Sequence, residues 1–491
     1  MSRVGSGTVG AGLLADRGDD ESRLRRTVVA GPGGTVEVDD AVLGGVLGSL
    51  VGTAVITAGL TAAGHADRRS RVLTGVVTVA VVLGLCLFRR ENYDLVLGRV
   101  LAGSPRWAMD GGPPTGQALS TARTRLAPDS MRAVFEQTAA GMPPAGPGSS
   151  VFGLLVTAFD GTVFDLAAAG DIQSVFATPS GGRFPQARLV TLIACGTRWI
   201  LAAMLGSSAV SEQHLVDQLA DALRPGTLNL ADRNFFSMAR WVRFTATGAD
   251  LAWRVKNGAK SLPARIVRVL PDSSATVRLV ESDAMLTARR AKTGDRHLAR
   301  LADTIARLVE FTLTVTDATG RARTTRFPIL TTLLDHEQHP AGQIAAAYAE
   351  RWQVEVIYLR VKSTLRGAGT RLRGQTPDLA VQEIWGLLTV YNALVGLAVA
   401  AAIVLDVDPD EISFAAVLAL TRTNATTDPG CVQCGHRPGL RVADLITAIA
   451  AQPRNRTRQR TSPRTKTQRR TERTRDVNYT ITIEASNLPK N

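Results

Sequence analysis

The sequence predicts an α/β protein with a mixed sheet, a β-rich insertion and long helices after it. Short apolar segments bounded by turn residues are typical of central strands, and they lie at 151–159, 189–194, 199–205 and 227–231. Further short β-like segments fill the region from about 244 to 333 and predict the insertion. Apolar periodicity then predicts helices over 341–365 and 379–405.

Composition limits the class of partner. The chain has 491 residues, 45% of them hydrophobic, so it is long enough for two or three domains with a large core. A formal net charge of +14 favours a polyanionic partner, either a nucleic acid or an anionic membrane surface. Four cysteines form no disulfide framework and no signal sequence opens the chain, which predicts a reducing cytoplasm.

Changes in composition divide the chain into six segments. Their order is a disordered lead-in at 1–37, a small helical N-terminal domain at 38–102, a linker at 103–148, the α/β domain at 149–405, a helical C-terminal region at 406–452, and a basic tail at 453–491. A short helical pattern around Ser130–Gln137 interrupts the linker. The tail carries ten Lys or Arg residues between Pro453 and Arg475 against one acid, Glu472. Such a segment is typical of a solvated, phosphate-contacting or merely solubilising end.

Two uncharged runs near the N-terminus leave an alternative open. Residues 41–64 and 72–88 contain no charged side chain, and hydropathy alone predicts a membrane hairpin. The first run is rich in glycine, and the second is at the short limit for crossing a bilayer. A buried helical domain is therefore the preferred interpretation, and we expect no membrane partner.

A cluster of functional side chains shares one face of the helix predicted over 341–365. At about 100° per residue, Tyr348, Arg351, Glu355 and Lys362 fall within roughly 60° of one another. Arg366 continues the same stripe and Trp352 lies at its margin. The face offers cations for phosphates, an aromatic surface for a base and one carboxylate. The alternative is a surface helix with a weak Arg351–Glu355 pair.

Two aspartates add carboxylates to this cluster. Asp160 and Asp232 each follow an apolar strand-like run directly, so their side chains can converge at one end of a sheet. Three carboxylates can hold two hard cations such as Mg²⁺, which activate water and stabilise a leaving oxygen. Each aspartate taken alone is more often a turn or cap residue.

These motifs together resemble a known family. Asp160-Gly161-Thr162, Asp232-Arg233-Asn234-Phe235 and the array Tyr-x2-Arg-x3-Glu-x6-Lys from Tyr348 to Lys362 are similar to those of DDE transposases of the insertion-sequence-4 group. The resemblance extends over roughly residues 40 to 450. It departs from the family pattern in the apolar N-terminal runs and in the apolar end of the 379–405 helix, which put recognition of DNA ends in doubt more than catalysis.

The resemblance implies a fold and a set of roles. It implies an RNase H-like catalytic core in which Asp160, Asp232 and Glu355 are the catalytic residues and the ligands of two Mg²⁺ ions, with Mn²⁺ as a possible substitute. Contacts with DNA are implied for Tyr348, Arg351 and Lys362, and expected also for Trp352, Arg366 and Arg233.

The implied activity is metal-dependent cleavage at the ends of an insertion element and strand transfer into target DNA. The expected partners are the inverted-repeat ends and target DNA, bound by a homodimer that is nucleoid-associated when on DNA. Two alternatives remain at this point, a catalytically inactive relic that binds DNA and a membrane-associated basic protein. The pattern Cys431-x2-Cys434-Gly435-His436 has half of a zinc-site spacing, and the polar cluster at 335–339 is interpreted as a loop.

Overall fold

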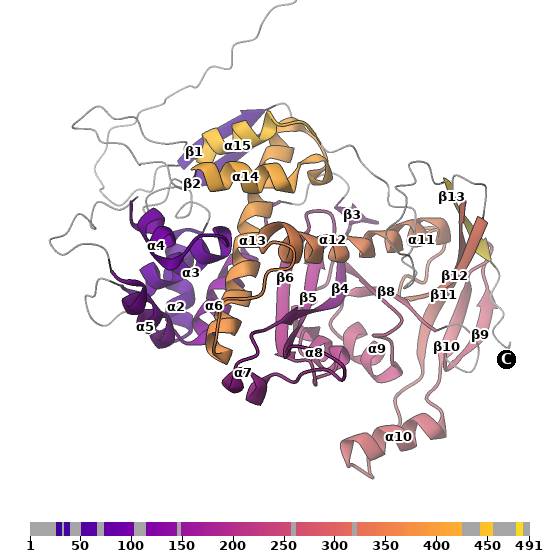
Figure 1. The fold of residues 1–491 in the computed structure, drawn as a ribbon. Helices are drawn as coiled ribbons and strands as arrows, with labels where there is room; N and C mark the ends of the chain where they lie inside the picture. The colour runs from indigo at the N-terminus through magenta and orange to yellow at the C-terminus, as the bar shows by residue number, and fades with distance from the viewer. Residues whose placement is uncertain are drawn as a thin grey trace, which may run out of the picture.

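The fold was obtained as a computed structural model (Figure 1). The residues that the structure describes are 26–31, 34–39, 51–65, 73–102, 114–144, 149–256, 262–316, 322–424, 442–454 and 478–484. Cys431, Cys434 and His436, and with them the half zinc motif, lie outside these ranges.

Five strands form the centre of the sheet in an RNase H-like arrangement. They are β4 (Leu154–Asp165), β5 (Gln186–Ala194), β6 (Trp199–Ser207), β7 (Thr227–Ala231) and β8 (Asp250–Arg254), in the spatial order β6-β5-β4-β7-β8. The first three are antiparallel neighbours, whereas β7 runs parallel to both β4 and β8. The predicted mixed α/β fold is therefore confirmed. β4 continues five residues beyond Asp160, so the prediction that this aspartate follows the end of a strand is wrong.

The β-rich insertion extends the same sheet. Its strands β9 (Ala264–Val269), β10 (Ala275–Leu279), β11 (Thr304–Thr316) and β12 (Ala322–Thr331) continue the sheet beyond β8 in the order β12-β11-β10-β9. The helix α10 (Asp283–Thr293) projects from it (Figure 1). β8 belongs to the central sheet beside β7, so the predicted insertion start near 244 is too early. β8 pairs in parallel with β7, and this pairing of separate segments leaves no local pattern in the sequence.

Helices cover both faces of the sheet. One face packs on α8 (Glu212–Asp217) and α9 (Met238–Thr245) through residues such as Phe159, Leu215 and Trp241. The other packs on α11 (Ala341–Ala349), α12 (Gln353–Leu359) and α13 (Pro377–Leu405), as Figure 1 shows. α8 is a short helix, and a 3₁₀ turn at Ala220–Ala222 follows it. Because side chains alternate along a strand, neighbouring β4 residues face different cores.

The N-terminal helices pack on one another, and three of them contact α13. The N-terminal helices are α2 (Thr53–Ala62), α3 (Gly75–Leu87), α4 (Tyr93–Ala102), α5 (Gly116–Arg125) and α6 (Pro128–Ala140), of which α3, α5 and α6 contact α13. The predicted linker at 103–148 is therefore wrong for residues 116–140, where α5 begins at the Thr115 cap and α6 begins with Pro128. The apolar residues of α3 are buried against α13 rather than exposed.

Within the described residues, α13 alone is long and apolar enough to cross a membrane by length and composition. Of its most apolar window, 83% is buried inside the protein. Its neighbours are α3, α6, α14 (Phe414–Asn424) and α15 (Val442–Ala450). This environment is that of the core helix of a globular protein.

Both predicted unstructured ends contain strands. β1 (Arg26–Gly31) and β2 (Gly34–Asp39) pair as an antiparallel hairpin, which corrects the predicted disordered lead-in. The alternation Thr35-Val36-Glu37-Val38 is a strand signal that the surrounding Gly and Asp residues concealed. At the other end, β13 (Asn478–Glu484) pairs with β11, so the basic segment is followed by a strand of the sheet instead of ending as a tail.

Candidate active site

Strand register brings the two aspartates together. Ala158 on β4 lies opposite Leu230 on β7, and continuing this parallel register by two residues places Asp232 level with Asp160. Asp232 directly follows β7, as predicted. Asp160 alternates with Phe159 along β4, and Phe159 belongs to the core under α8 and α9. Asp160 therefore faces the opposite side, where α11 and α12 lie.

The segment that carries Glu355 lies across this end of the sheet. It consists of α11, a 3₁₀ turn at Glu350–Trp352, α12, and a π-helical turn at Arg360–Leu365. Tyr348 Oη donates to Ala231 O over 3.3 Å, and Lys362 Nζ donates to Val163 O over 2.7 Å. These side chains thus share one face that contacts β4 and β7, which agrees with the helical spacing in the sequence.

The Arg351 guanidinium lies among the three carboxylates. Its Nη1 is 3.9 Å from Asp160 Oδ2, and it interacts electrostatically with Asp232 and Glu355 as well. Although burial opposes the change, Tyr348 and these three acids raise the pKa of Arg351 above its usual range. The cation therefore stays charged and balances the acids in this structure.

The carboxylates themselves are incompletely compensated. Burial raises the pKa of Asp160 to about 6, with Arg351 opposing the shift and the nearby acids Glu212 and Glu355 adding to it. Glu355 Oε2 is buried and has no hydrogen-bond partner, and the same holds for Arg351 Nε. A buried carboxylate oxygen without a partner costs free energy, and such groups mark ligand-binding positions.

The donor set fits a divalent metal ion chemically. Carboxylate oxygens are the ligands that Mg²⁺ prefers, and the buried, unpartnered Glu355 Oε2 is suitable for this role. In the part of the chain that the structure describes, no three acidic, His or Cys side chains are close enough to hold an ion between them. The side chains of Asp160, Asp232 and Glu355 must therefore shift toward one another, away from Arg351, to form a complete metal site.

The expected DNA contacts differ in their accessibility. Arg233 is exposed, Trp352 and Lys362 are partly buried, and Arg366 is almost completely buried. The Trp352 ring lies 5.1 Å from the Arg351 guanidinium carbon. Tyr348 is only 4% exposed, and its hydroxyl is occupied by Ala231. The predicted Tyr348 contact with phosphate therefore does not match this structure, in which Tyr348 fixes the backbone just before Asp232.

Sequence reasoning missed three residues of the site. Tyr358 Oη donates to Asp160 O over 2.5 Å and lies 2.9 Å from Thr191 Oγ1, so it anchors β4 at the aspartate. Its position seven residues after Arg351 on the same helical face was a usable signal. Arg254 lies 3.9 Å from Asp232 Oδ1. The Glu212 carboxylate occupies the space that a side chain on Gly161 would need. The pairing of β8 with β7 brings Arg254 here, and the packing of α8 on the sheet brings Glu212.

Comparisons with known proteins agree with this geometry. Residues 152–393 match the transposase DDE domain, and residues 43–136 match the insertion element 4 transposase N-terminal domain. The transposase InsG for insertion sequence element IS4 of Escherichia coli (strain K12) is 27% identical over 338 residues, which cover 67% of this chain and 71% of that protein. The piggyBac transposase in a synaptic complex with hairpin DNA is similar at 10% identity and a TM-score of 0.40, covering 85% of this chain and 87% of that one. That structural similarity is too weak to support an argument.

The RNase H-like sheet, with acids on two adjacent parallel strands and a third on the helix across them, defines a DDE transposase. Enzymes of this class act on DNA and generally use divalent metal ions. Both matched domains and the InsG similarity place the chain within the insertion-sequence-4 family, to which it belongs.

Proposed function

We propose that the chain cuts DNA at the ends of an insertion element and joins the freed 3′-hydroxyl to target DNA. Asp160, Asp232 and Glu355 are the proposed ligands of two Mg²⁺ ions. The observation that carries this proposal is the position of Glu355 Oε2, which is buried and without a partner on the helix facing Asp160 and Asp232. When bound, the ions would activate the attacking oxygen and stabilise the leaving one.

The side chains around the acids have separate proposed roles. Tyr358 and Tyr348 hold the backbone at Asp160 and before Asp232 through their hydroxyl groups. Arg351 balances the acids in the free protein and turns its guanidinium toward a DNA phosphate when metal ions take its place. Trp352 offers an aromatic surface beside Arg351 for an unpaired end base. Arg233, exposed next to Asp232, is a further phosphate contact.

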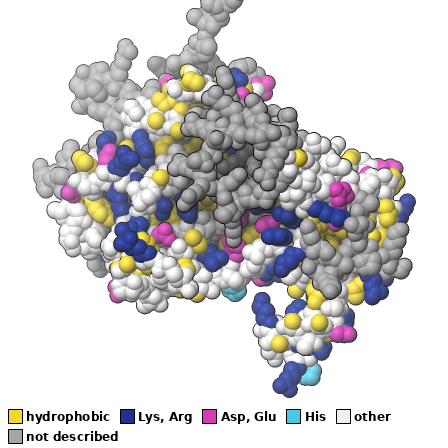
Figure 2. All heavy atoms as spheres, turned by 45° about the vertical axis from the view of Figure 1, so that its right-hand side comes forward, with side chains coloured by type: hydrophobic (Ala, Val, Ile, Leu, Met, Phe, Trp, Pro, Cys, Tyr) yellow, Lys and Arg dark blue, Asp and Glu magenta, His cyan; other side chains and the backbone are white. Residues whose placement is uncertain are grey.

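The surface charge agrees with a DNA partner. Lys and Arg side chains gather in several clusters on the face shown in Figure 2, and the whole chain has a formal net charge of +14. Phosphate contacts by such side chains supply most of the sequence-independent affinity of DNA-binding proteins. Because both ends of an element must be held together for strand transfer, we propose that the chain acts as a homodimer on DNA, in the cytoplasm and at the nucleoid.

The test is cleavage in vitro of a duplex carrying the inverted repeats that flank this gene, with Mg²⁺ or Mn²⁺. Wild type is compared with Asp160→Ala, Asp232→Ala and Glu355→Ala, and each variant is checked for an unchanged melting temperature. The proposal expects cleavage by the wild type and none by the three variants. Cleavage by any folded variant at the wild-type rate would remove that residue from the site, and absence of cleavage by the wild type would favour an inactive relic.

A further inference from the structure

A run of cations continues beyond the catalytic helix segment. The stretch from Lys362 to Arg373 contains four cations, with Arg366 and Arg371 between them, and no acid. Lys362 is partly buried and Arg366 is almost completely buried, and this burial lowers the pKa of both side chains. Arg371, in contrast, is exposed.

These cations follow β4 away from Asp160. Lys362 Nζ donates to Thr162 Oγ1 over 3.2 Å, two residues beyond Asp160. The Arg366 guanidinium carbon lies 5.6 Å from the centre of the Phe164 ring. Farther along, Leu166 N donates to Pro185 O, and the Arg371 guanidinium stacks 4.3 Å above the neighbouring Phe184 ring. The cations therefore form a track along one strand, from the acids to Phe184.

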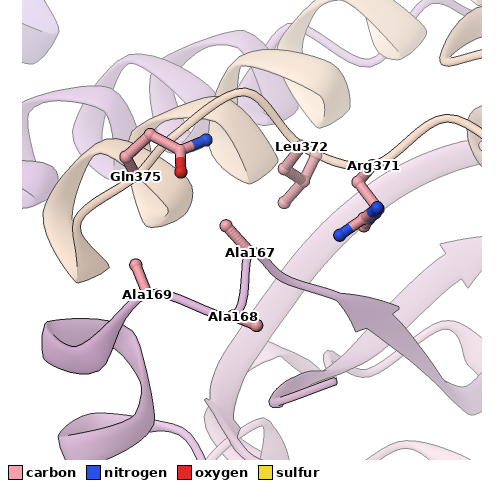
Figure 3. Close-up of a pocket in the computed structure, with 6 residues that line it drawn as sticks. All are labelled: Ala167, Ala168, Ala169, Arg371, Leu372 and Gln375. Carbon is pink, nitrogen blue, oxygen red and sulfur yellow. The ribbon is translucent and has the colours of Figure 1, made fainter. Parts of the chain in front are cut away.

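The track ends at a pocket of about 310 Å³. Figure 3 shows Arg371 and Gln375 on either side of a floor built from small apolar side chains, and the lining residues are Ala167, Ala168, Ala169, Arg371, Leu372 and Gln375. The alanine floor lets a ligand approach the backbone closely. The Arg371 guanidinium, whose carbon lies 4.3 Å from the centre of the Phe184 ring, supplies N–H donors suited to a phosphate in this pocket.

Hydrogen bonds to its backbone hold the loop that carries Arg371 in place. Arg89 Nη2 donates to Arg371 O over 2.6 Å. The buried Glu383 carboxylate accepts from Arg373 N over 2.7 Å and from Gly374 N over 3.0 Å. Because these bonds fix the backbone before any ligand binds, Arg371 loses little conformational freedom on contacting a phosphate.

We propose that Arg371 and this pocket bind a backbone phosphate of duplex DNA at a distance from the cleaved bond. The six residues from Asp160 to Leu166 span about 20 Å at 3.3 Å per residue. This length corresponds to about six base pairs at 3.4 Å each. The inference rests on the proposed function, and it adds a second phosphate contact on the same duplex.

One acidic side chain, that of Asp165, lies beside the track. Asp165 is exposed, interacts with Lys362 and Arg366, and accepts a hydrogen bond from Gln186 Nε2 over 2.8 Å. It lies on the β4 position that alternates away from Phe164, so it flanks the track without interrupting it. Arg183, whose guanidinium lies 5.5 Å from the Phe184 ring, adds an exposed cation at the far end.

Binding can be measured without cleavage by fluorescence anisotropy in EDTA. The probe is a labelled duplex that carries the inverted repeat flanking this gene and continues about 15 base pairs on both sides of the cleaved bond, well past the span of the track. Two further probes are cut back to about 3 base pairs on one side or the other. The variants are Arg371→Gln, Arg371→Lys and the control Arg224→Gln, which removes an exposed cation at the opposite end of β7.

We expect Arg371→Gln to bind the long duplex about tenfold or more weakly than the wild type. The slope of log affinity against log salt concentration should decrease by the contribution of about one phosphate contact. Arg371→Lys keeps the positive charge but loses the guanidinium fork. Its affinity should therefore depend on salt as that of the wild type does, while the affinity itself is partly reduced. On one of the shortened probes Arg371→Gln and wild type should bind equally. Equal binding of Arg371→Gln and Arg224→Gln to the long duplex, or an undiminished loss on both shortened probes, would overturn the inference. Failure of the proposed function differs, because the wild type would then not cleave the long duplex when Mg²⁺ is added.

Discussion

Two buried arginine–carboxylate clusters in this molecule have opposite character. In the insertion, Arg307 donates to Ser274 Oγ over 2.8 Å and to His339 O over 2.7 Å, and it also pairs with Asp272. At the active site, Arg351 reaches Asp160 only over 3.9 Å, and its Nε has no hydrogen-bond partner. The first cluster is saturated with hydrogen bonds, whereas the second is not.

The pKa values of Asp272 and Asp160 shift in opposite directions, in agreement with the different hydrogen bonding of the two clusters. Although burial opposes the change, hydrogen bonds from Ser274 and the charge of Arg307 lower the pKa of Asp272. Burial instead raises the pKa of Asp160 to about 6, because Arg351 compensates it only partly. A saturated cluster stabilises the fold, and an unsaturated one keeps oxygen atoms available for a ligand. The two clusters should therefore respond differently to substitution.

The largest effect is expected on activity at the unsaturated cluster. Glu355→Gln keeps the volume of the side chain but removes the charge of a proposed metal ligand. Because a bound metal ion contributes several kcal/mol of transition-state stabilisation, cleavage should fall by about 1,000-fold or more. The melting temperature should not fall, since Glu355 Oε2 has no hydrogen-bond partner to lose. If Glu355→Gln cleaves within tenfold of the wild-type rate, or clearly lowers the melting temperature, the cluster around Arg351 does not differ from the cluster around Arg307 in the way proposed.

The next effect is expected on stability at the saturated cluster. Arg307→Met leaves the partly buried Asp272 without its fully buried cation and removes the donor to three backbone carbonyl groups. The free energy of unfolding should fall by about 3–5 kcal/mol, as for other broken buried pairs. Urea denaturation at neutral pH measures this. The double variant Arg307→Met/Asp272→Leu should recover part of the loss, and a loss that the second substitution deepens would show that the pair is not the cause.

A third prediction concerns pH in the metal-free protein. Because folding raises the pKa of Asp160 from 3.8 to about 6, the folded state binds this proton more tightly than the unfolded chain. The resulting stability is present below pH 3.8 and is lost as the pH rises through 6. Wild type should therefore lose up to about 3 kcal/mol relative to Asp160→Asn between pH 4 and pH 7. Denaturation of both proteins in EDTA across this range is the measurement, and a difference that stays constant with pH would be the contrary outcome.

The residues proposed as catalytic stand out in the sequence through local signals, and their motifs resemble those of a known family. Asp232 follows the apolar run of β7, and Glu355 shares a helical face with Arg351. The surrounding cluster depends on contacts between distant segments. Arg254 approaches Asp232 only because β8 pairs with β7, and Tyr348 is buried only because the helix lies on the sheet. Neither contact leaves a periodic pattern in the sequence.

The errors at the chain ends have a different origin. The sequence Asn-Tyr-Thr-Ile-Thr-Ile-Glu of β13 alternates as a strand does, but the basic segment before it concealed this signal. Its pairing with β11 joins residues more than 160 positions apart. Composition correctly described the charge of that segment but could not predict the strand after it. α5 and α6 lie among Pro and Gly residues that suggested a linker, although a short helical pattern around 130–137 marks part of α6 in the sequence.

The smallest expected effect is at an exposed pair of the same chemistry. Arg132 Nε lies 2.8 Å from Glu136 Oε1 on α6, a shorter distance than that between Arg351 and Asp160, and both side chains are largely exposed. Solvent screens this pair and it costs side-chain entropy, so Arg132→Ala should change the free energy of unfolding by less than about 0.5 kcal/mol. Urea denaturation of this variant beside Arg307→Met tests whether burial, rather than distance, decides what an arginine–carboxylate pair contributes. A loss at Arg132 comparable to that at Arg307 would mean that burial is not the deciding factor.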